Sequence, residues 1–136
     1  MQSIVVQEGS RETPPTRIVP ESAPRFSENA EERSVEYCEC VVDIVAALFG
    51  VSSRDLRRPG RSNTATSRVR QIGMYVAHVV LRLNMTEVGR GFGRDRTTVQ
   101  HACHLVEDLR DNEEFDRLVV MTERVVAAAF RGRLED

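Results

Sequence analysis

The sequence contains no lysine and no tryptophan: all 19 basic residues are arginine, and aromatic residues make up only 5% of the chain. Without lysine there is no Walker A loop, whose lysine holds nucleotide phosphates, and no lysine Schiff-base chemistry. Because aromatic residues are enriched in strands, their scarcity favours a helical core of valine, leucine, isoleucine and alanine. The guanidinium group of arginine suits the bidentate binding of phosphate and guanine.

Cysteine is also scarce, and long apolar runs are absent. Cys38, Cys40 and Cys103 are odd in number and lack CxxC spacing, so we expect no disulfide framework and a reducing, cytoplasmic environment. His101 and His104 would share a helix face that Cys103 does not, so we expect no metal site. No apolar run reaches 18 residues and no signal peptide is visible, so we expect a soluble protein without membrane contact.

The net charge of −2 conceals a strong division of charge along the chain. Residues 1–53 carry 4 arginines and 9 acidic residues, and residues 97–136 carry 5 and 9. Residues 54–96, by contrast, carry 10 arginines and 3 acidic residues. A basic middle between acidic ends is typical of a nucleic-acid-binding face on an acidic domain. The alternative is a charged surface that is merely solvated.

Two regions are expected. Residues 1–33 hold four of the five prolines and no lasting hydrophobic period, which predicts a disordered tail. Residues 34–130 show apolar residues at helical spacing, which predicts an all-α domain with no strand. The six expected helices, several with a capping signal, run from Ser34 to Gly50, from Ser52 through Leu56, from near Ser67 to Leu83, from Asn84 to Phe92, from Arg94 or Asp95 to Arg110, and from Asn112 to Ala129.

The fourth and fifth expected helices form a helix-turn-helix. Gly93 between them can adopt the positive φ that reverses the chain, while Gly89 and Gly91 predict close approach to neighbouring helices. The next helix opens with the run Arg94-Asp95-Arg96-Thr97-Thr98. Short polar and guanidinium side chains at this position can reach phosphates and base edges in the major groove. We therefore expect the chain to bind double-stranded DNA.

Two blocks of this sequence resemble the C-terminal DNA-binding domain of the bacterial replication initiator family, DnaA. They are Arg70-Gln71-Ile72-Gly73-Met74-Tyr75-Val76 and Glu87-Val88-Gly89-x-x-Phe92-Gly93-Arg94-Asp95-x-Thr97-Thr98-Val99-x-His101-Ala102. The similarity extends over roughly residues 38 to 120. It implies binding of DnaA-box-like sites in replication initiation or its regulation. The family's ATPase domain is missing from this sequence, so we expect neither nucleotide binding nor ATPase activity.

The resemblance also implies which residues contact DNA. Bases in the major groove would be read from the first turn of the recognition helix, by Asp95, Arg96 and Thr97, after Arg94 and with Thr98 and His101 near phosphates. An arginine of the basic loop would enter the minor groove, with Arg61 the best match and Arg58 the second. Phosphate or backbone contacts would come from Arg70, Gln71, Met85 and Thr86. For three of these residues a plainer role stays open: a surface position for Gln71, a half-buried position for His101, and capping or packing for Thr98.

The chemistry of the first turn fits this assignment. An aspartate can accept a hydrogen bond from cytosine, an arginine can bind guanine with both arms, and a threonine offers a hydroxyl and a methyl group for thymine. Three departures from the family bear on the DNA sequence that is read. The basic loop aligns imperfectly, because it is diluted by Asn63, Thr64, Ala65 and Thr66. Gly93 stands alone where the family has two glycines, so the turn is one residue shorter, and Arg96 replaces a histidine.

A function of a different class is an interaction protein that mimics the initiator's domain and sequesters one of its regulatory proteins. The shortened turn, Arg96 and the acidic ends favour it. Catalysis is not expected, because Asp95 and His101 would lie on different sides of one helix and no nucleophile–base pair has a suitable spacing. Nothing in the sequence requires a cofactor.

Overall fold

The computed structural model describes residues 26–60 and 62–133. Over these residues the chain forms six α-helices and no strand, which confirms the expected all-α fold. The helices are α1 (Ala30–Phe49), α2 (Ser53–Arg57), α3 (Thr64–Val79), α4 (Met85–Phe92), α5 (Arg96–Leu109) and α6 (Glu113–Ala129). Most of the expected tail lies outside the described residues, and so does Arg61.

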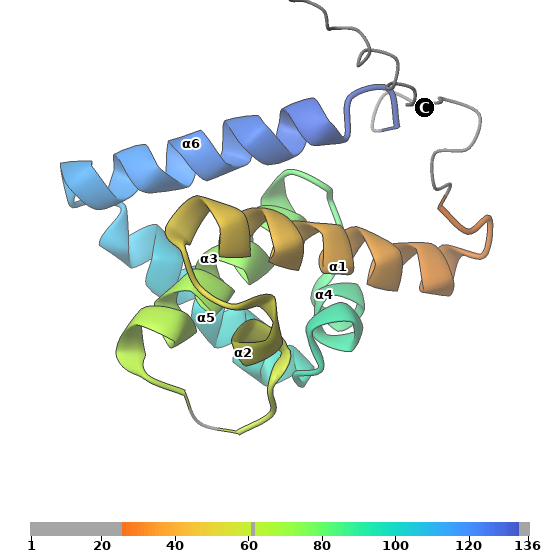
Figure 1. Cartoon of the computed structure of the whole chain (residues 1–136), viewed down its shortest axis with the longest axis horizontal. Coiled ribbons are helices and arrows are strands. Elements are labelled where there is room, and N and C mark those ends of the chain that lie inside the picture. The colour runs from red at the N-terminus through yellow and green to blue at the C-terminus, as the bar shows by residue number, and fades with distance from the viewer. Residues whose placement is uncertain (1–25, 61, 134–136) are drawn as a thin grey trace, which may run out of the picture.

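Helices α1 and α3 form the centre of the domain (Figure 1). Helix α1 packs against α3 and α4, and α3 packs against α5. Helix α6 crosses one side of this bundle, whereas α2, the loop that follows it and the N-terminal end of α5 lie on the opposite side (Figure 1). The fold therefore separates the loop after α2 and the start of α5 from α6.

The expected caps Ser52, Asn84 and Asn112 are confirmed, and Asp95, one of the two expected first residues of the next helix, is the N-cap of α5. Ser52, Asn84, Asp95 and Asn112 each accept a hydrogen bond from a backbone N–H three residues further on, at the start of α2, α4, α5 and α6 respectively. At α4 the carboxylate of Glu87 also accepts from the N–H of Asn84, which completes a capping box. These local signals fix where the helix-turn-helix begins.

The first helix begins earlier than expected. Asn29, rather than Ser34, caps α1 by accepting from the N–H of Glu32, and Glu31 and Glu32 lie in its first turn, where the helix dipole favours acidic residues. Ser34 lies buried inside the helix, and its hydroxyl donates to the carbonyl of Glu31. Residues 30–33 therefore belong to the folded domain.

The third helix also differs from its expected limits. Asn63 caps it, so it begins at Thr64 rather than near Ser67, and it ends at Val79 rather than Leu83. After Val79 the chain turns through Arg82, the one non-glycine residue with a positive φ (63°) in the described part of the chain. The loop after α2 is consequently short, from residue 58 to residue 63.

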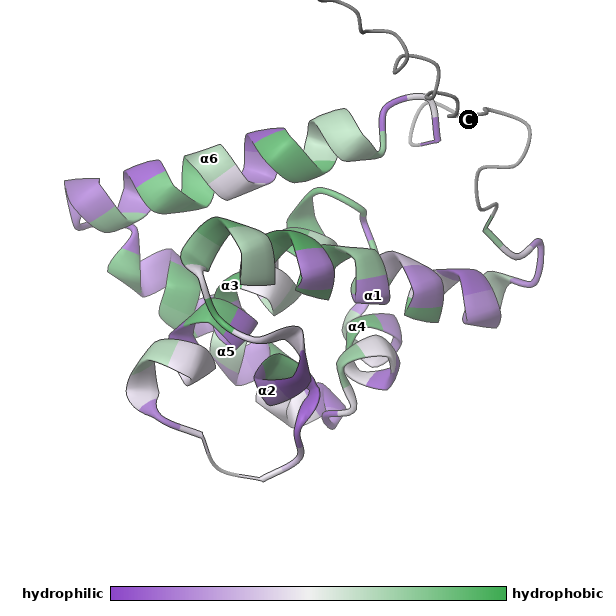
Figure 2. Ribbon diagram, in the orientation of Figure 1, coloured by the Kyte–Doolittle hydropathy of each residue, from purple (hydrophilic) through white to green (hydrophobic). Residues whose placement is uncertain are grey.

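The core consists mainly of aliphatic side chains from all six helices and the α3–α4 turn. Among the described residues, no helix has the length and apolar character needed to cross a bilayer. Hydrophobic residues continue onto the outer surface of α6 (Figure 2), where Leu118, Met121 and Val125 are exposed.

Two polar or aromatic clusters secure α6 to the bundle. The guanidinium of Arg110 donates to Asp116 and Glu123 of α6 and to the hydroxyl of Tyr75 in α3. At the other end of α6, the ring of Phe130 contacts those of Phe26 and Tyr37, with centroids 5.8 and 4.9 Å away.

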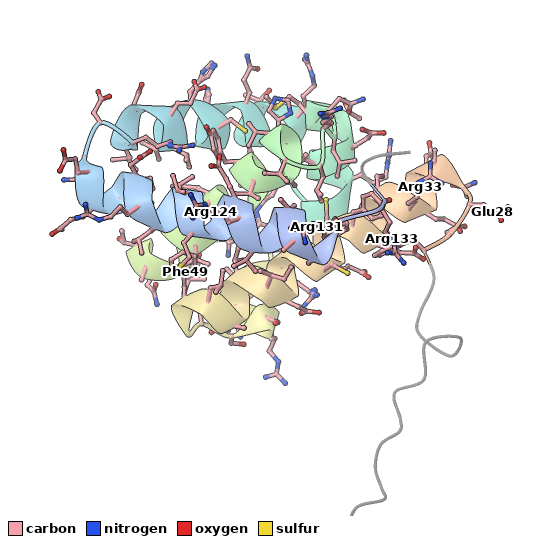
Figure 3. The ribbon with its side chains drawn as sticks, turned by 90° about the horizontal axis from the view of Figure 1, so that it is seen from above. Glu28, Arg33, Phe49, Arg124, Arg131 and Arg133 are labelled. Carbon is pink, nitrogen blue, oxygen red and sulfur yellow. The ribbon has the colours of Figure 1, made fainter. Side chains whose placement is uncertain are left out.

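Arg133 completes the second cluster. Its guanidinium lies 4.9 Å from the centroid of the Phe26 ring. Figure 3 shows Arg133 and Arg33 at the same end of the domain, where α1 begins. The two ends of the described chain thus meet at one end of α6.

Candidate nucleic-acid interface

The first turn of α5 carries the expected base-reading residues. Asp95 is its N-cap, and Oδ1 accepts from the N–H of Thr98 at 2.7 Å. This bond, with a second from the Thr98 hydroxyl, lowers the pKa of the Asp95 carboxyl below its ordinary value. Arg96, Thr97 and Thr98 are all exposed. The turn thus presents two hydroxyls and a guanidinium at the positive end of the helix dipole.

Glycines allow the helix-turn-helix to close tightly. Gly93 ends α4 with a φ of 69°, in the left-handed region. A Cβ at Gly89 would lie 2.5 Å from the carbonyl oxygen of Arg94, and one at Gly91 would lie 2.4 Å from Cys38 of α1. The expected close approach to a neighbouring helix is confirmed at Gly91, where α4 contacts α1. At Gly89 the close neighbour is instead the turn before α5.

The side chain of Arg70 is largely engaged with backbone groups of the protein itself. Its side chain is only 6% exposed, and its guanidinium donates to the carbonyls of Leu56 (2.9 Å) and Asp55 (3.1 Å) at the end of α2. Burial, and then the nearby charge of Arg94, lowers the pKa of Arg70. Most of this side chain therefore supports α2 from inside, and a contact of Arg70 with the DNA backbone stays a prediction.

A cleft of about 210 Å³ lies between α3 and α5 and brings the two sequence blocks together. Its polar lining comes from Ser67, Arg70 and Gln71 of α3, from Arg94 in the turn, and from Thr98 and His101 of α5. His101 is exposed rather than half-buried. The cleft is thus lined by two positive charges and several hydrogen-bonding groups, which suits an anion.

Sequence reasoning missed two residues of this cleft region. Ser67 lines the cleft, and Arg68 donates to Oε1 of Gln71 at 2.8 Å, which orients the Gln71 amide. The signal was available, because residues three or four apart on a helix are neighbours. Once Gln71 is chosen on α3, its neighbours at positions 67 and 68 follow.

The remaining expected residues lie outside the cleft lining. Met85 and Thr86 open α4, at the opposite end of that helix from α5; Met85 is half-buried and Thr86 exposed. Arg58 is exposed and pairs with Asp55 at 3.2 Å. Arg61 lies outside the described residues. The described residues contain no group of three or more histidine, cysteine or acidic side chains arranged to hold a metal ion.

Comparisons with known proteins agree with this arrangement. Residues 38–106 match the family described as the bacterial DnaA protein helix-turn-helix. The chain is 33% identical over 87 residues to the chromosomal replication initiator protein DnaA of Mycobacteroides abscessus, covering 62% of this chain and 18% of the relative. It is 40% identical over 76 residues to the protein of the same name from Mesorhizobium japonicum, covering 55% and 15%. The chain therefore spans less than a fifth of the length of these relatives.

Solved structures give the same result. A crystal structure of a DNA replication initiation factor superposes with a TM-score of 0.67 at 31% identity, covering 75% of this chain and 32% of that one. The AMPPCP-bound DnaA of Aquifex aeolicus superposes with a TM-score of 0.65 at 30% identity, covering 75% and 31%. With the family match over half of the sequence, these likenesses show that the chain belongs to the family of bacterial DnaA helix-turn-helix domains.

Proposed function

We propose that this protein binds double-stranded DNA at DnaA-box-like sites and acts in replication initiation or its regulation. The observation that carries the proposal is the exposed first turn of α5, where Arg96 and Thr97 face solvent beside a cationic cleft. In a helix-turn-helix protein, the start of the second helix is the part that enters the major groove.

Base reading would come from this turn. Arg96 can donate two hydrogen bonds to guanine, and Thr97 can contact the methyl group of thymine. Asp95 already has a structural role as the N-cap of α5, because its Oδ1 accepts a hydrogen bond from the N–H of Thr98. Its carboxylate can also accept from cytosine, since each carboxylate oxygen has more than one lone pair.

The cleft between α3 and α5 would hold a phosphate of the DNA backbone. Ser67, Gln71, Thr98 and His101 supply hydrogen-bonding groups there, and Arg94 supplies positive charge. Contacts of this kind fix the register of a helix in the groove but carry no sequence information. The proposed interface thus divides into a reading turn and an adjacent phosphate site.

A binding-site selection from random duplexes, at fixed physiological salt, tests the proposal. The purified chain should enrich one motif, and the double variant Arg96→Ala, Thr97→Ala should lose that motif while keeping weak, general DNA binding. Asp95 is left unchanged in this variant because it caps α5. Arg124→Ala, which removes an exposed charge on α6, is the matched control and should select the original motif.

Two results would contradict the proposal. If the unaltered chain enriches no motif, it does not read DNA sequence. If the double variant still selects the original motif, the first turn of α5 is not the reading element. In the first case, a role as an initiator mimic that contacts proteins would become the better hypothesis.

A further inference from the structure

Three backbone carbonyls at the end of α2 accept hydrogen bonds from two arginines of other elements. Arg70 of α3 binds the carbonyls of Asp55 and Leu56, as described above. Nη2 of Arg94 donates to the carbonyl of Arg58 at 3.0 Å, although the two residues are 36 positions apart in sequence. The end of α2 is therefore held from two sides.

The backbone of Arg94 is itself firmly placed. Its N–H donates to the carbonyl of Gly89 at 2.9 Å, and its own carbonyl oxygen lies so close to Gly89 that no Cβ fits between them. Asp95, the next residue, caps α5. Because the Arg94 backbone is fixed relative to α4 and α5, a group that its side chain binds is held in a defined position relative to both helices.

The loop of residues 58–63 has few other restraints among its described residues. The carboxylate of Asp55 pairs with Arg58, and the hydroxyl of Ser62 bonds to that of Ser67 at 3.0 Å. Both bonds join the loop to an element that directly precedes or follows it. The bond from Arg94 differs, because it joins the loop to the start of α5.

We propose that Arg94 is a positioning residue: its bond to the carbonyl of Arg58 holds the start of the loop, residues 58–60, against the reading turn, so that both meet the duplex as one unit. The inference rests on the proposed function together with the expectation, drawn from the sequence resemblance, that an arginine of the loop contacts the same DNA molecule. An untied loop would have to be ordered at the moment of binding, and that loss of conformational freedom would weaken the complex. In this role Arg94 acts through the loop backbone, in addition to any charge it offers to DNA.

Hydrogen exchange of the free protein tests, without DNA, whether the bond from Arg94 to the Arg58 carbonyl restrains the loop. In Arg94→Ala, the loop amides of Arg58, Gly60 and Ser62 should exchange about fivefold faster, which is what the loss of one ordinary hydrogen bond gives. Amides in the middle of α1 and α3 should keep their rates. Arg90→Ala is the matched control, since it removes one arginine from neighbouring α4, where its nearest acidic partner, Glu31, is 3.9 Å away. It should leave the loop amides unchanged.

A double-mutant cycle on DNA then tests the consequence. Arg58→Ala removes a loop charge but keeps the carbonyl that Arg94 binds, so it should weaken DNA binding while Arg94 is present. In the Arg94→Ala background the same change should have a much smaller effect, because the loop is no longer held against the duplex. For Arg94→Ala, the slope of the logarithm of affinity against the logarithm of salt concentration should also become shallower. The change should exceed the roughly 0.9 expected for one lost phosphate contact.

The possible outcomes distinguish the restraint of the loop by Arg94 from the proposed DNA binding. If the loop amides exchange at unchanged rates in Arg94→Ala, the positioning role is overturned, whatever the DNA-binding result. An equal rise of the exchange rates throughout the domain would also overturn it. Faster loop exchange with fully additive effects on DNA would overturn the proposed coupling. Faster loop exchange in a chain that binds no DNA would leave the restraint standing and contradict only the proposed function.

Discussion

Arginines of one short basic region differ in how far their side chains are available to a ligand. Arg96 is exposed at the start of α5, whereas Arg70 is almost completely buried and bound to carbonyls of α2. Counting arginines in a sequence therefore overstates the number of free charges on a DNA-binding face. Each substitution has to be interpreted by what its side chain touches.

Arg96→Ala should weaken binding at one position of the target site and leave the fold intact. The expected loss is roughly 1–3 kcal/mol for a guanidinium that reads one base pair. Titration of duplexes substituted at single positions measures it, and thermal unfolding checks the fold. If all duplexes weaken by the same factor, Arg96 contacts phosphate instead of a base.

Asp95 should make the stability of the domain depend on pH in the acid range. Its pKa is lowered in the folded state by bonds from Thr98, so its charged form stabilises the fold above the ordinary value of 3.8. This contribution is lost as the pH falls through the lowered pKa. Asp95→Asn keeps a capping oxygen but cannot titrate.

Urea unfolding of both proteins between neutral and strongly acidic pH measures this contribution. The native chain should exceed Asp95→Asn in stability at neutral pH, and the difference should shrink below pH 3.8. Other carboxyl groups are common to both proteins and cancel. A difference that stays constant with pH would contradict the assignment.

At the scale of helices, the sequence predicted those starts where a capping residue precedes an amphipathic turn. Asn84 and Asp95 are of this kind. Helices α1 and α3 begin a turn or nearly a turn earlier than predicted, because their first residues, Ala30 to Glu32 and Thr64 to Ala65, are exposed and show no apolar period. A hydrophobic pattern marks where a helix meets the core, which need not be where it begins.

The reading turn was predictable from the sequence because residues 94–98 form one continuous segment after a turn glycine. The burial of Arg70 was not, because it depends on how α2 packs against α3. The bond from Arg94 to the carbonyl of Arg58 could not be predicted from the sequence either, since it joins two residues that are far apart in the chain. Every residue has a backbone carbonyl, so the type of the accepting residue does not reveal such a contact.

Gly89→Ala should damage the helix-turn-helix more than an ordinary helix substitution does. Alanine normally stabilises a helix relative to glycine, but here its Cβ would lie 2.5 Å from the backbone oxygen of Arg94. The turn must move, at a cost of about 1–3 kcal/mol, which is typical of overpacking. Urea unfolding and DNA titration should both show a loss.

A matched substitution separates this clash from a general effect of alanine in α4. Arg90→Ala lies in the same helix at an exposed position and should leave stability within about 0.5 kcal/mol of the native chain. If Gly89→Ala is as stable as the native chain and binds DNA equally well, the close contact does not matter in solution.

Across the whole molecule, the expected DNA-reading turn and the exposed apolar residues of α6 lie on opposite sides. Helix α2, the loop after it and the start of α5 lie away from α6, which exposes Leu118, Met121 and Val125 (Figures 1 and 2). An acidic protein with this division can still bind a polyanion, because the field at the interface depends on nearby charges more than on the net charge.

The salt dependence of binding should reveal this division. With about five or six phosphates neutralised, the logarithm of affinity should fall with the logarithm of salt at a slope of about −5. Fluorescence anisotropy over a salt series measures the slope. Arg124→Ala, on α6, should leave it unchanged, and a slope near zero would mean that phosphates contribute little to binding.

The aromatic contact of Phe26, Tyr37 and Phe130 has a practical consequence for handling the protein. It brings the beginning of α1 and the end of α6 to one corner, remote from α2 and the loop after it (Figure 1). A dye or an immobilising linker placed beside Arg133 would therefore sit clear of a docked duplex. Such a probe could follow association in real time without competing for the groove.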